Sequence, residues 1–180
     1  MSGKRSFVRL ARGFSLLELV VVVCAVAILA GVALNRLLPL VGRAQRAAFL
    51  QVRSELSSAL LLEAADRITR GEAATLPELA AANPMTLLLE PPANYVGSFE
   101  RPDEAEIPRA SWYYDEQLGR LGYRVGRHTR FAAGDGPAEL IELEVAFVYQ
   151  DRDGDGVFDA EGDRFEGLRL TPVHAYDWPD

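Results

Sequence analysis

Hydrophobic and polar positions divide the chain into an apolar first part and a mixed remainder. An almost unbroken apolar run extends from Phe14 to Leu34, with Glu18 as its one charged residue. A helix rises about 1.5 Å per residue, so about 20 such residues cross the roughly 30 Å hydrocarbon layer of a membrane. The pattern therefore predicts a membrane-spanning helix, which we assign to residues 14–38.

Glu18 is an unusual member of such a helix. A charged side chain costs on the order of 3 kcal/mol at mid-membrane and less near a helix end, so we expect it to have a partner. Cutting the chain between Gly13 and Phe14 would create an α-amino group close by, but Glu18 lies one turn from that N-terminus of its own chain. A neighbouring copy could supply the amine instead.

The helical pattern continues after the apolar run. Residues 40–69 hold no proline and, after Gly42, no glycine, and they are rich in strong helix formers. Apolar side chains recur there at helical spacing, at Phe49, Val52, Leu56, Ala59 and Leu60. We expect this stripe to pack on a globular head and Gly71 to end the helix.

The last part of the chain has the two-residue period of strands. Residues 70–109 change to a proline-rich and acidic composition without a sustained period and predict a variable connecting region. The sheet is assigned to residues 110–180, with predicted strands at 111–115, 120–125, 140–149 and 167–173. The predicted fold class is α+β, with a long N-terminal helix packed on a C-terminal antiparallel sheet.

A short motif stands at the start of the apolar run. The leader, residues 1–13, carries four basic residues, and the sequence Gly13-Phe14-Ser15-Leu16-Leu17-Glu18 follows. This motif resembles that of the type IV pilin-like superfamily, which comprises type IV pilins and type II secretion pseudopilins. The resemblance implies that a prepilin peptidase cuts between Gly13 and Phe14 and methylates the Phe14 amine. It also implies that Glu18 neutralises the amine of the adjacent subunit during filament assembly.

The resemblance further implies a filament subunit rather than an enzyme. Its partners would be other pilin or pseudopilin subunits and the inner-membrane assembly platform. Because basic residues flank the cytoplasmic side of a span, we expect one pass through the bacterial inner membrane, a cytoplasmic N-terminus and a periplasmic head, residues 39–180. The filament would be a periplasmic pseudopilus or an extracellular pilus. Many pilins have a helix-kinking proline where this chain has Asn35; here Pro39 leaves the location of a kink open.

Four alternatives remain beside this interpretation. A secretory signal with a weak cleavage site at Gly31-Val32-Ala33 and a plain single-span anchor both explain the apolar run, but neither explains Glu18. A membrane-anchored, calcium-dependent binding module outside any filament would tolerate Glu18→Ala. A secreted enzyme would have its mature N-terminus at Leu34.

Composition narrows the classes of function. The formal net charge is −7, and removing the basic leader makes the chain more acidic still. Such a surface disfavours nucleic acid as a partner, because phosphate binding relies on clustered Lys and Arg. The single cysteine, Cys24, lies in the apolar run, so no intramolecular disulfide can form. The two histidines, His128 and His174, stand far apart, and no nucleophile motif predicts catalysis.

A second motif, the acidic loop, spans Asp151 to Asp163. Carboxylates at alternate positions and glycines for sharp turns are typical of loops that bind Ca²⁺ through oxygen. The predicted ligands are Asp151, Asp153, Asp155, the Val157 carbonyl, Asp159 and Asp163, with Glu166 as the alternative closing ligand. Gly162 stands where an EF-hand has its bidentate Glu, so the loop resembles instead the compact DxDxDG calcium loops of extracellular proteins. A solvated acidic turn is the alternative.

Calcium would have a structural role in this setting. Without a cation, the acidic side chains of the loop would repel one another, and a bound ion could hold the C-terminal strand in place of the missing disulfide. Calcium-stapled sheets are also known in the pseudopilin branch of the family that the motif resembles, which favours that branch.

Overall fold

The computed structural model describes residues 15–127 and 129–179, except for the side chains of Leu38 and Pro39. The chain separates into two compact units, Met1–Leu38 and Pro39–Asp180, which are described separately below. Helix α1, Leu16–Thr69, contributes its first part to one unit and its second part to the other. The second unit, called the head, holds every other helix and strand of the described residues.

Both ends of α1 have defined capping contacts. At the start, the Glu18 N–H donates to Ser15 Oγ at 3.2 Å, which places Ser15 as the N-cap. At the end, Gly71 adopts a positive φ of 78°, the Gly71 N–H donates to the Ile68 carbonyl, and the Glu72 N–H donates to the Arg67 carbonyl. This pair of bonds is a Schellman motif, which satisfies carbonyls that the last turn leaves free. The predicted stop at Gly71 is confirmed.

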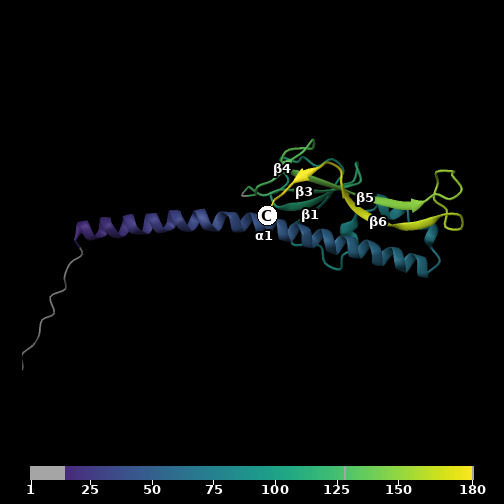
Figure 1. The fold of residues 1–180 in the computed structure, drawn as a ribbon, viewed down its shortest axis with the longest axis horizontal. Helices are drawn as coiled ribbons and strands as arrows, with labels where there is room; N and C mark the ends of the chain where they lie inside the picture. Colours follow the sequence, from purple (N-terminus) through teal and green to yellow (C-terminus); the bar gives the residue numbers. More distant parts are fainter. Residues whose placement is uncertain (1–14, 128, 180) are drawn as a thin grey trace, which may run out of the picture. The chain divides into compact units, whose positions relative to one another are not determined.

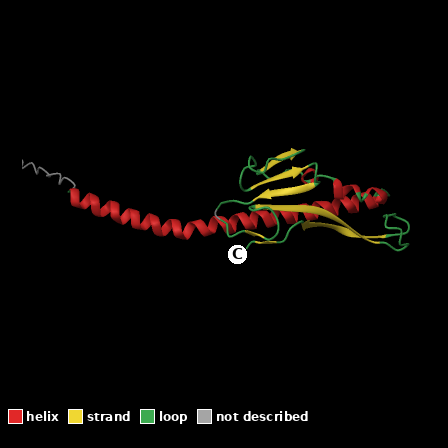
Figure 2. Cartoon of the chain, turned by 90° about the horizontal axis from the view of Figure 1, so that it is seen from above, coloured by secondary structure: helices red, strands yellow, loops and turns green. Residues whose placement is uncertain are grey.

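The head contains a mostly antiparallel five-stranded sheet in the order β1-β2-β3-β5-β6. Its strands are β1, Tyr95–Phe99; β2, Ser111–Asp115; β3, Arg120–Arg124; β5, Leu140–Gln150; and β6, Arg164–Pro172. A separate two-stranded sheet pairs β4, Ala132–Ala133, with β7, Tyr176–Asp177. Figures 1 and 2 show the second part of α1 running along the five-stranded sheet. The predicted α+β fold class is confirmed.

One face of α1 closes the main core of the head. The buried side chains of this face, Phe49, Val52, Leu56 and Leu60, cluster with side chains from β2, β3, β5 and β6. The Phe49 ring stacks on Trp112 with centroids 5.0 Å apart, and Trp112 also contacts its cross-strand partner Tyr123 at 4.8 Å. Burial of an aliphatic side chain such as Leu56 or Leu60 stabilises the fold by about 1.5–3 kcal/mol. Ala59, predicted in the same stripe, is only half-buried.

A second cluster lies nearer the end of α1. Ala64 packs there with Leu76 and Leu79, and the partly buried rings of Phe158 and Phe165 lie against them. The connecting region holds three short helices: η1, Ala73–Thr75; α2, Glu78–Ala81; and η2, Pro84–Leu87. It supplies Leu76, which follows η1, and Leu79, which lies on α2. The region predicted as variable is thus partly ordered by burial of its few apolar side chains.

A close contact joins β2 and β3, between Tyr113 and Gly122. A β-carbon added to Gly122 would lie 2.2 Å from Tyr113 Cζ, so the Tyr113 ring covers the glycine on the neighbouring strand. The Tyr113 side chain is buried in a small cluster with Ile107 and Leu140. Burial raises the pKa of its phenol, with smaller contributions from nearby carboxylates.

The structure corrects the predicted sheet in three places. Strand β1 pairs parallel to β2, because residues 100–110 carry the chain back to the edge where β1 begins; there Asn94 Nδ2 donates to the Ala110 carbonyl at 2.6 Å. Strand β6 begins at Arg164 rather than residue 167, because Phe165 packs on Phe147, with ring centroids 5.5 Å apart. Strands β4 and β7 are too short to produce a readable period.

Candidate functional sites: the apolar helix and the acidic loop

The first part of α1 exposes its apolar side chains. Every described side chain from Ser15 to Leu37 is exposed, including Leu16 at 80% and Leu29 at 68%. Among the described residues, α1 is the one helix long and apolar enough to cross a membrane, judged by length and composition. A soluble monomer rarely presents so large an apolar surface, so this segment is suited to lipid or to other apolar helices.

The start of α1 has a capping contact that sequence reasoning missed. Ser15 and Glu18 form the Ser-x-x-Glu pattern of a capping box, and the Ser15 hydroxyl accepts the Glu18 N–H. A carboxylate in the first turn also lies at the positive end of the helix dipole. The pattern is readable in the sequence, and it predicts helix capping in addition to the intermolecular charge pair of Glu18. Any test of that charge pair must therefore separate it from capping.

The predicted processing residues, Gly13 and Phe14, lie outside the described residues, so cleavage and methylation stay predictions. Helix α1 includes both Asn35 and Pro39, and Pro39 has no N–H to donate to the helix backbone. Cys24 is exposed on the apolar part of the helix.

The acidic loop connects β5 to β6 at the end of their hairpin (Figure 1). Aromatic rings anchor its base: Phe147 meets Phe158 edge-on at 5.0 Å, and Tyr149 meets Phe158 at 5.4 Å. Since this aromatic group packs against the Ala64 cluster, the loop is fixed to the core at its base, while Asp151, Asp153 and Asp155 are exposed.

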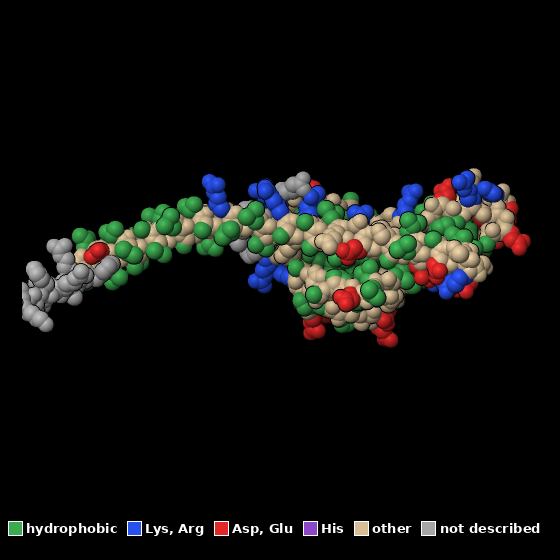
Figure 3. All heavy atoms as spheres, turned by 90° about the horizontal axis from the view of Figure 1, so that it is seen from below, with side chains coloured by type: hydrophobic (Ala, Val, Ile, Leu, Met, Phe, Trp, Pro, Cys, Tyr) green, Lys and Arg blue, Asp and Glu red, His purple; other side chains and the backbone are tan. Residues whose placement is uncertain are grey.

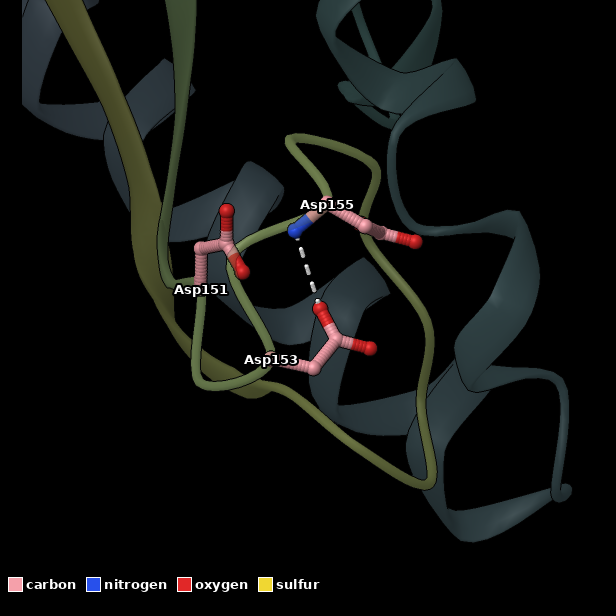
Figure 4. A group of neighbouring side chains, drawn as sticks. All are labelled: Asp151, Asp153 and Asp155. Carbon is pink, nitrogen blue, oxygen red and sulfur yellow. Dashed lines mark hydrogen bonds between the residues drawn. The ribbon is translucent and has the colours of Figure 1, made fainter.

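Three predicted ligands lie together in this loop. Asp151, Asp153 and Asp155 are exposed, and each offers a carboxylate oxygen within 4.8 Å of the others (Figure 4). Such a group could hold a metal ion, and oxygen-only ligands favour a hard cation such as Ca²⁺. Figure 4 also shows the Asp155 N–H donating to the Asp153 carboxylate at 3.2 Å.

Backbone N–H groups hold these carboxylates in place. Asp151 accepts from Gly154 at 2.7 Å and from Gly156 at 2.9 Å, and Asp155 accepts from Val157 at 2.7 Å. Both glycines have positive φ, 79° and 77°, which aims their N–H groups inward with little strain. Each carboxylate oxygen has two lone pairs, so these bonds leave acceptor capacity for a cation. The three carboxylates could therefore hold a metal ion.

Asp159 and Asp163 close the loop on itself. The Asp163 side chain is buried, and its two oxygens accept the N–H groups of Arg152 at 2.9 Å and Asp159 at 3.1 Å. Asp159 Oδ1 accepts from Glu161 at 2.9 Å and from Gly162 at 2.5 Å. Neither residue belongs to the group of three carboxylates. Their roles as ligands stay predictions, as do those of the exposed Val157 and of Glu166, which lies on β6.

Neighbouring carboxylates in the loop have opposite pKa shifts. The pKa of Asp151 is lowered, chiefly because the Gly154 and Gly156 N–H groups stabilise its anion. The Asp155 N–H acts to lower the pKa of Asp153 as well, but desolvation and the charges of Asp155, Asp163 and Asp151 raise it overall. Desolvation and the same carboxylates raise the pKa of Tyr149. A bound cation would relieve this repulsion.

Of the histidines, His128 lies outside the described residues. His174 is half-buried between two carboxylates, with Nδ1 3.6 Å from Asp135 and Nε2 3.6 Å from Glu142. Its contacts join the C-terminal segment to β5 and to the loop before it.

Comparison with family models, with curated proteins and with solved structures gave no match. The architecture itself is pilin-like: a long N-terminal helix, apolar in its first part, whose second part packs on a C-terminal, mostly antiparallel sheet.

Proposed function

We propose that this chain is a structural subunit of a type IV pilus-like or type II secretion pseudopilus filament, taking part in pilus biogenesis or protein secretion. The observation that carries the proposal is Glu18 in the first turn of an exposed apolar helix that continues into a pilin-like head. An anchor alone needs the apolar surface but not the carboxylate.

The charge of Glu18 supplies the physical argument for assembly. In a lipid bilayer, a carboxylate on this helix is costly, although less so near the end than at mid-membrane. In a bundle of such helices, the freed amine of an adjacent copy neutralises it, and apolar contacts between helices replace contacts with lipid. Neutralisation of the Glu18 charge therefore stabilises the helix bundle relative to the isolated subunit in lipid.

Processing and location follow from the same proposal. A prepilin peptidase removes residues 1–13 and methylates Phe14, and an inner-membrane platform moves the subunit into the filament. The head is periplasmic before assembly and belongs afterwards to a periplasmic pseudopilus or an extracellular pilus. The basic residues of the leader and the apolar run support this orientation.

Calcium belongs to the proposal as a structural ion of the acidic loop. The grouped carboxylates of Asp151, Asp153 and Asp155 support it, as do the backbone bonds that orient them. The ion would join the start of the loop to its middle and thereby stiffen the β5–β6 connection. We propose no catalytic role for it.

The mature N-terminus tests the proposal most directly. Mass spectrometry of the full chain isolated from a bacterial inner membrane that contains a prepilin peptidase should find N-methylated Phe14 as the first residue. The control is Gly13→Leu, which should keep the leader. A native protein that retains the leader would overturn the proposal, and an N-terminus at Leu34 would favour a secreted protein.

A further inference from the structure

The head carries opposite charges at its two ends. The acidic end is the β5–β6 connection, where Asp151 to Glu166 holds seven carboxylates against the guanidinium groups of Arg152 and Arg164. One calcium ion would neutralise two of these charges and leave the end acidic. The aromatic base of the loop lies against Ala64, which places this end near the C-terminus of α1.

The basic end lies near the other limit of the head's part of α1. Between Glu18 and Glu55 the sequence contains no acidic residue, and Arg43 is exposed on α1. The loop after β3 lies on the same turn of helix: a β-carbon at Gly126 would be 2.2 Å from Gln45 Oε1. Two more exposed arginines, Arg127 and Arg130, follow Gly126.

Two acidic residues lie near this basic end. Asp177 on β7 is exposed and pairs in register with Ala132, and the charge of Arg127 is among those that lower the pKa of Glu139. Arg46, one residue from Gln45, is half-buried and has an interaction of its own, so the basic end is described by Arg43, Arg127 and Arg130. Figure 3 shows mainly blue side chains at the start of the head, and both red and blue side chains toward its far end.

The two ends are well separated along the helix. Gln45 and Ala64 mark them, and at about 1.5 Å per residue they lie roughly 30 Å apart. One molecule cannot bring both ends together within the head, but two molecules in line can. Contacts of this head-to-tail kind are heterologous and generate open filaments instead of closed dimers.

We propose that the basic end of one head, at Arg43, Arg127 and Arg130, docks on the acidic β5–β6 loop of the next copy. The inference rests on the proposed filament, and it names the surfaces through which successive heads meet. Charge complementarity favours a second copy over an anionic lipid surface, because lipid would match the basic end and leave the acidic end without a counterpart. Glu161 is the acidic partner chosen for the test, since it is exposed and is not a predicted calcium ligand.

Charge reversal on the full chain in detergent, with calcium present, tests the contact. Arg127→Glu with Arg130→Glu should weaken self-association at least about tenfold at low salt, because like charges then face each other. Glu161→Arg alone should weaken it too, and the three changes together should restore most of the loss. Arg101→Glu, an exposed arginine of the segment after β1, is the matched control and should change little. Sedimentation velocity at low and high salt measures the association.

Disulfide trapping adds a test of direction. In a Cys24→Ala chain that also carries Arg130→Cys and Glu161→Cys, oxidation should produce a ladder of dimers, trimers and longer products. Each single-cysteine variant should stay largely monomeric, because its thiol then faces Glu161 or Arg130 of the next copy instead of a second thiol. A ladder from the double variant together with monomeric single variants is the signature of head-to-tail contact.

The outcomes separate this inference from the proposed function. If the reversals leave self-association unchanged and no ladder forms while Phe14 is the methylated N-terminus, the docking proposal is overturned and the filament proposal stands. If a ladder forms but the native chain retains its leader, the docking proposal stands and the filament proposal is overturned. If Arg127→Glu with Arg130→Glu weakens only retention on vesicles containing phosphatidylglycerol, the basic end binds lipid and the docking proposal is wrong.

Discussion

The two parts of α1 have opposite relations to the rest of the chain. From Leu16 to Leu37 each described side chain is exposed, whereas from Phe49 to Ala64 every turn or so buries an apolar side chain in the head. The second part buries its apolar side chains within the molecule, whereas the first part can bury its apolar side chains only against lipid or other molecules. The comparison teaches that a continuous helix can hold two separate sources of stability, which substitutions can address one at a time.

The largest contrast is expected from leucine truncation in the two parts. Leu56 is fully buried, so Leu56→Ala should lower the free energy of unfolding of the head by about 2–5 kcal/mol. Leu29→Ala, at a position 68% exposed, should leave the head unchanged. Both tryptophans, Trp112 and Trp178, are buried in the head, so their fluorescence during urea unfolding of the full chain in detergent reports on the head alone. Equal losses from both substitutions would remove the contrast.

Glu18 sharpens the comparison in the exposed part. Glu18→Gln keeps a capping-box residue but removes the charge, and it should reduce assembled filament at least about tenfold, within the roughly 3 kcal/mol scale of a membrane charge. Ser15→Ala keeps the charge and removes the cap, which should cost about 1 kcal/mol of helix stability and leave assembly largely intact. Filament yield measured by sedimentation of sheared cells distinguishes them. If Ser15→Ala is as harmful as Glu18→Gln, the stability of the first helical turn, and not the charge of Glu18, limits assembly.

Calcium binding tests the acidic loop between β5 and β6, at the end of the head near the C-terminus of α1. At a calcium concentration about 100 times the dissociation constant, binding should stabilise the head by about 2.7 kcal/mol, and chelation should remove this. Asp153→Ala combined with Asp155→Ala should abolish the dependence, which differential scanning calorimetry with and without chelator measures. Glu161→Ala, in the same loop, is the control. If chelation leaves the melting temperature of the wild-type chain unchanged, the loop is a solvated acidic turn.

The end of α1 should show a smaller effect. Gly71 has φ of 78°, where a side chain is strained by roughly 1–2 kcal/mol, and space around its Cα is open, so Gly71→Ala should destabilise the head by about that amount through strain alone. Gly31→Ala, in the exposed part of the helix, also meets open space but lacks the positive φ, and it should not destabilise. Urea unfolding followed by tryptophan fluorescence compares them.

The smallest effects concern protonation of the acidic loop. The lowered pKa of Asp151 means that its charge stabilises the fold above its ordinary pKa, and this contribution is lost as pH falls through the folded-state value. The raised pKa of Asp153 has the opposite sign, so its charge opposes folding at neutral pH. In chelator at pH 7, Asp151→Asn should lower the melting temperature slightly and Asp153→Asn should raise it slightly. The difference should shrink as the pH falls below the ordinary pKa of an aspartate, and shifts of equal sign at pH 7 would contradict it.

The sequence predicted the helices and strands that a local residue pattern specifies, and it did not predict those that depend on contacts between distant residues. The hairpin of β2 and β3 was readable from its aromatic residues on both sides of a turn, and β5 from its alternating apolar and acidic residues. Helix α1 was readable because its apolar stripe has helical spacing. The parallel pairing of β1 was not readable, since it depends on where residues 100–110 return the chain. Pairing of β4 with β7 likewise depends on contacts between distant residues.

The same division applies to the acidic loop. Alternation placed Asp151, Asp153 and Asp155 together because a short turn brings alternate residues to one side. The burial of Asp163 and its bonds to the backbone of Arg152 and Asp159 could not be read from spacing, because they depend on how the loop folds over its aromatic base.

The Tyr113 ring lying over Gly122 has an evolutionary consequence. A methyl group at position 122 would overlap the ring, so Gly122→Ala alone should be selected against, whereas a smaller residue at 113 would leave room for it. Among homologues of this chain, the two positions should therefore vary together: a large aromatic opposite glycine, or a small residue opposite a side chain.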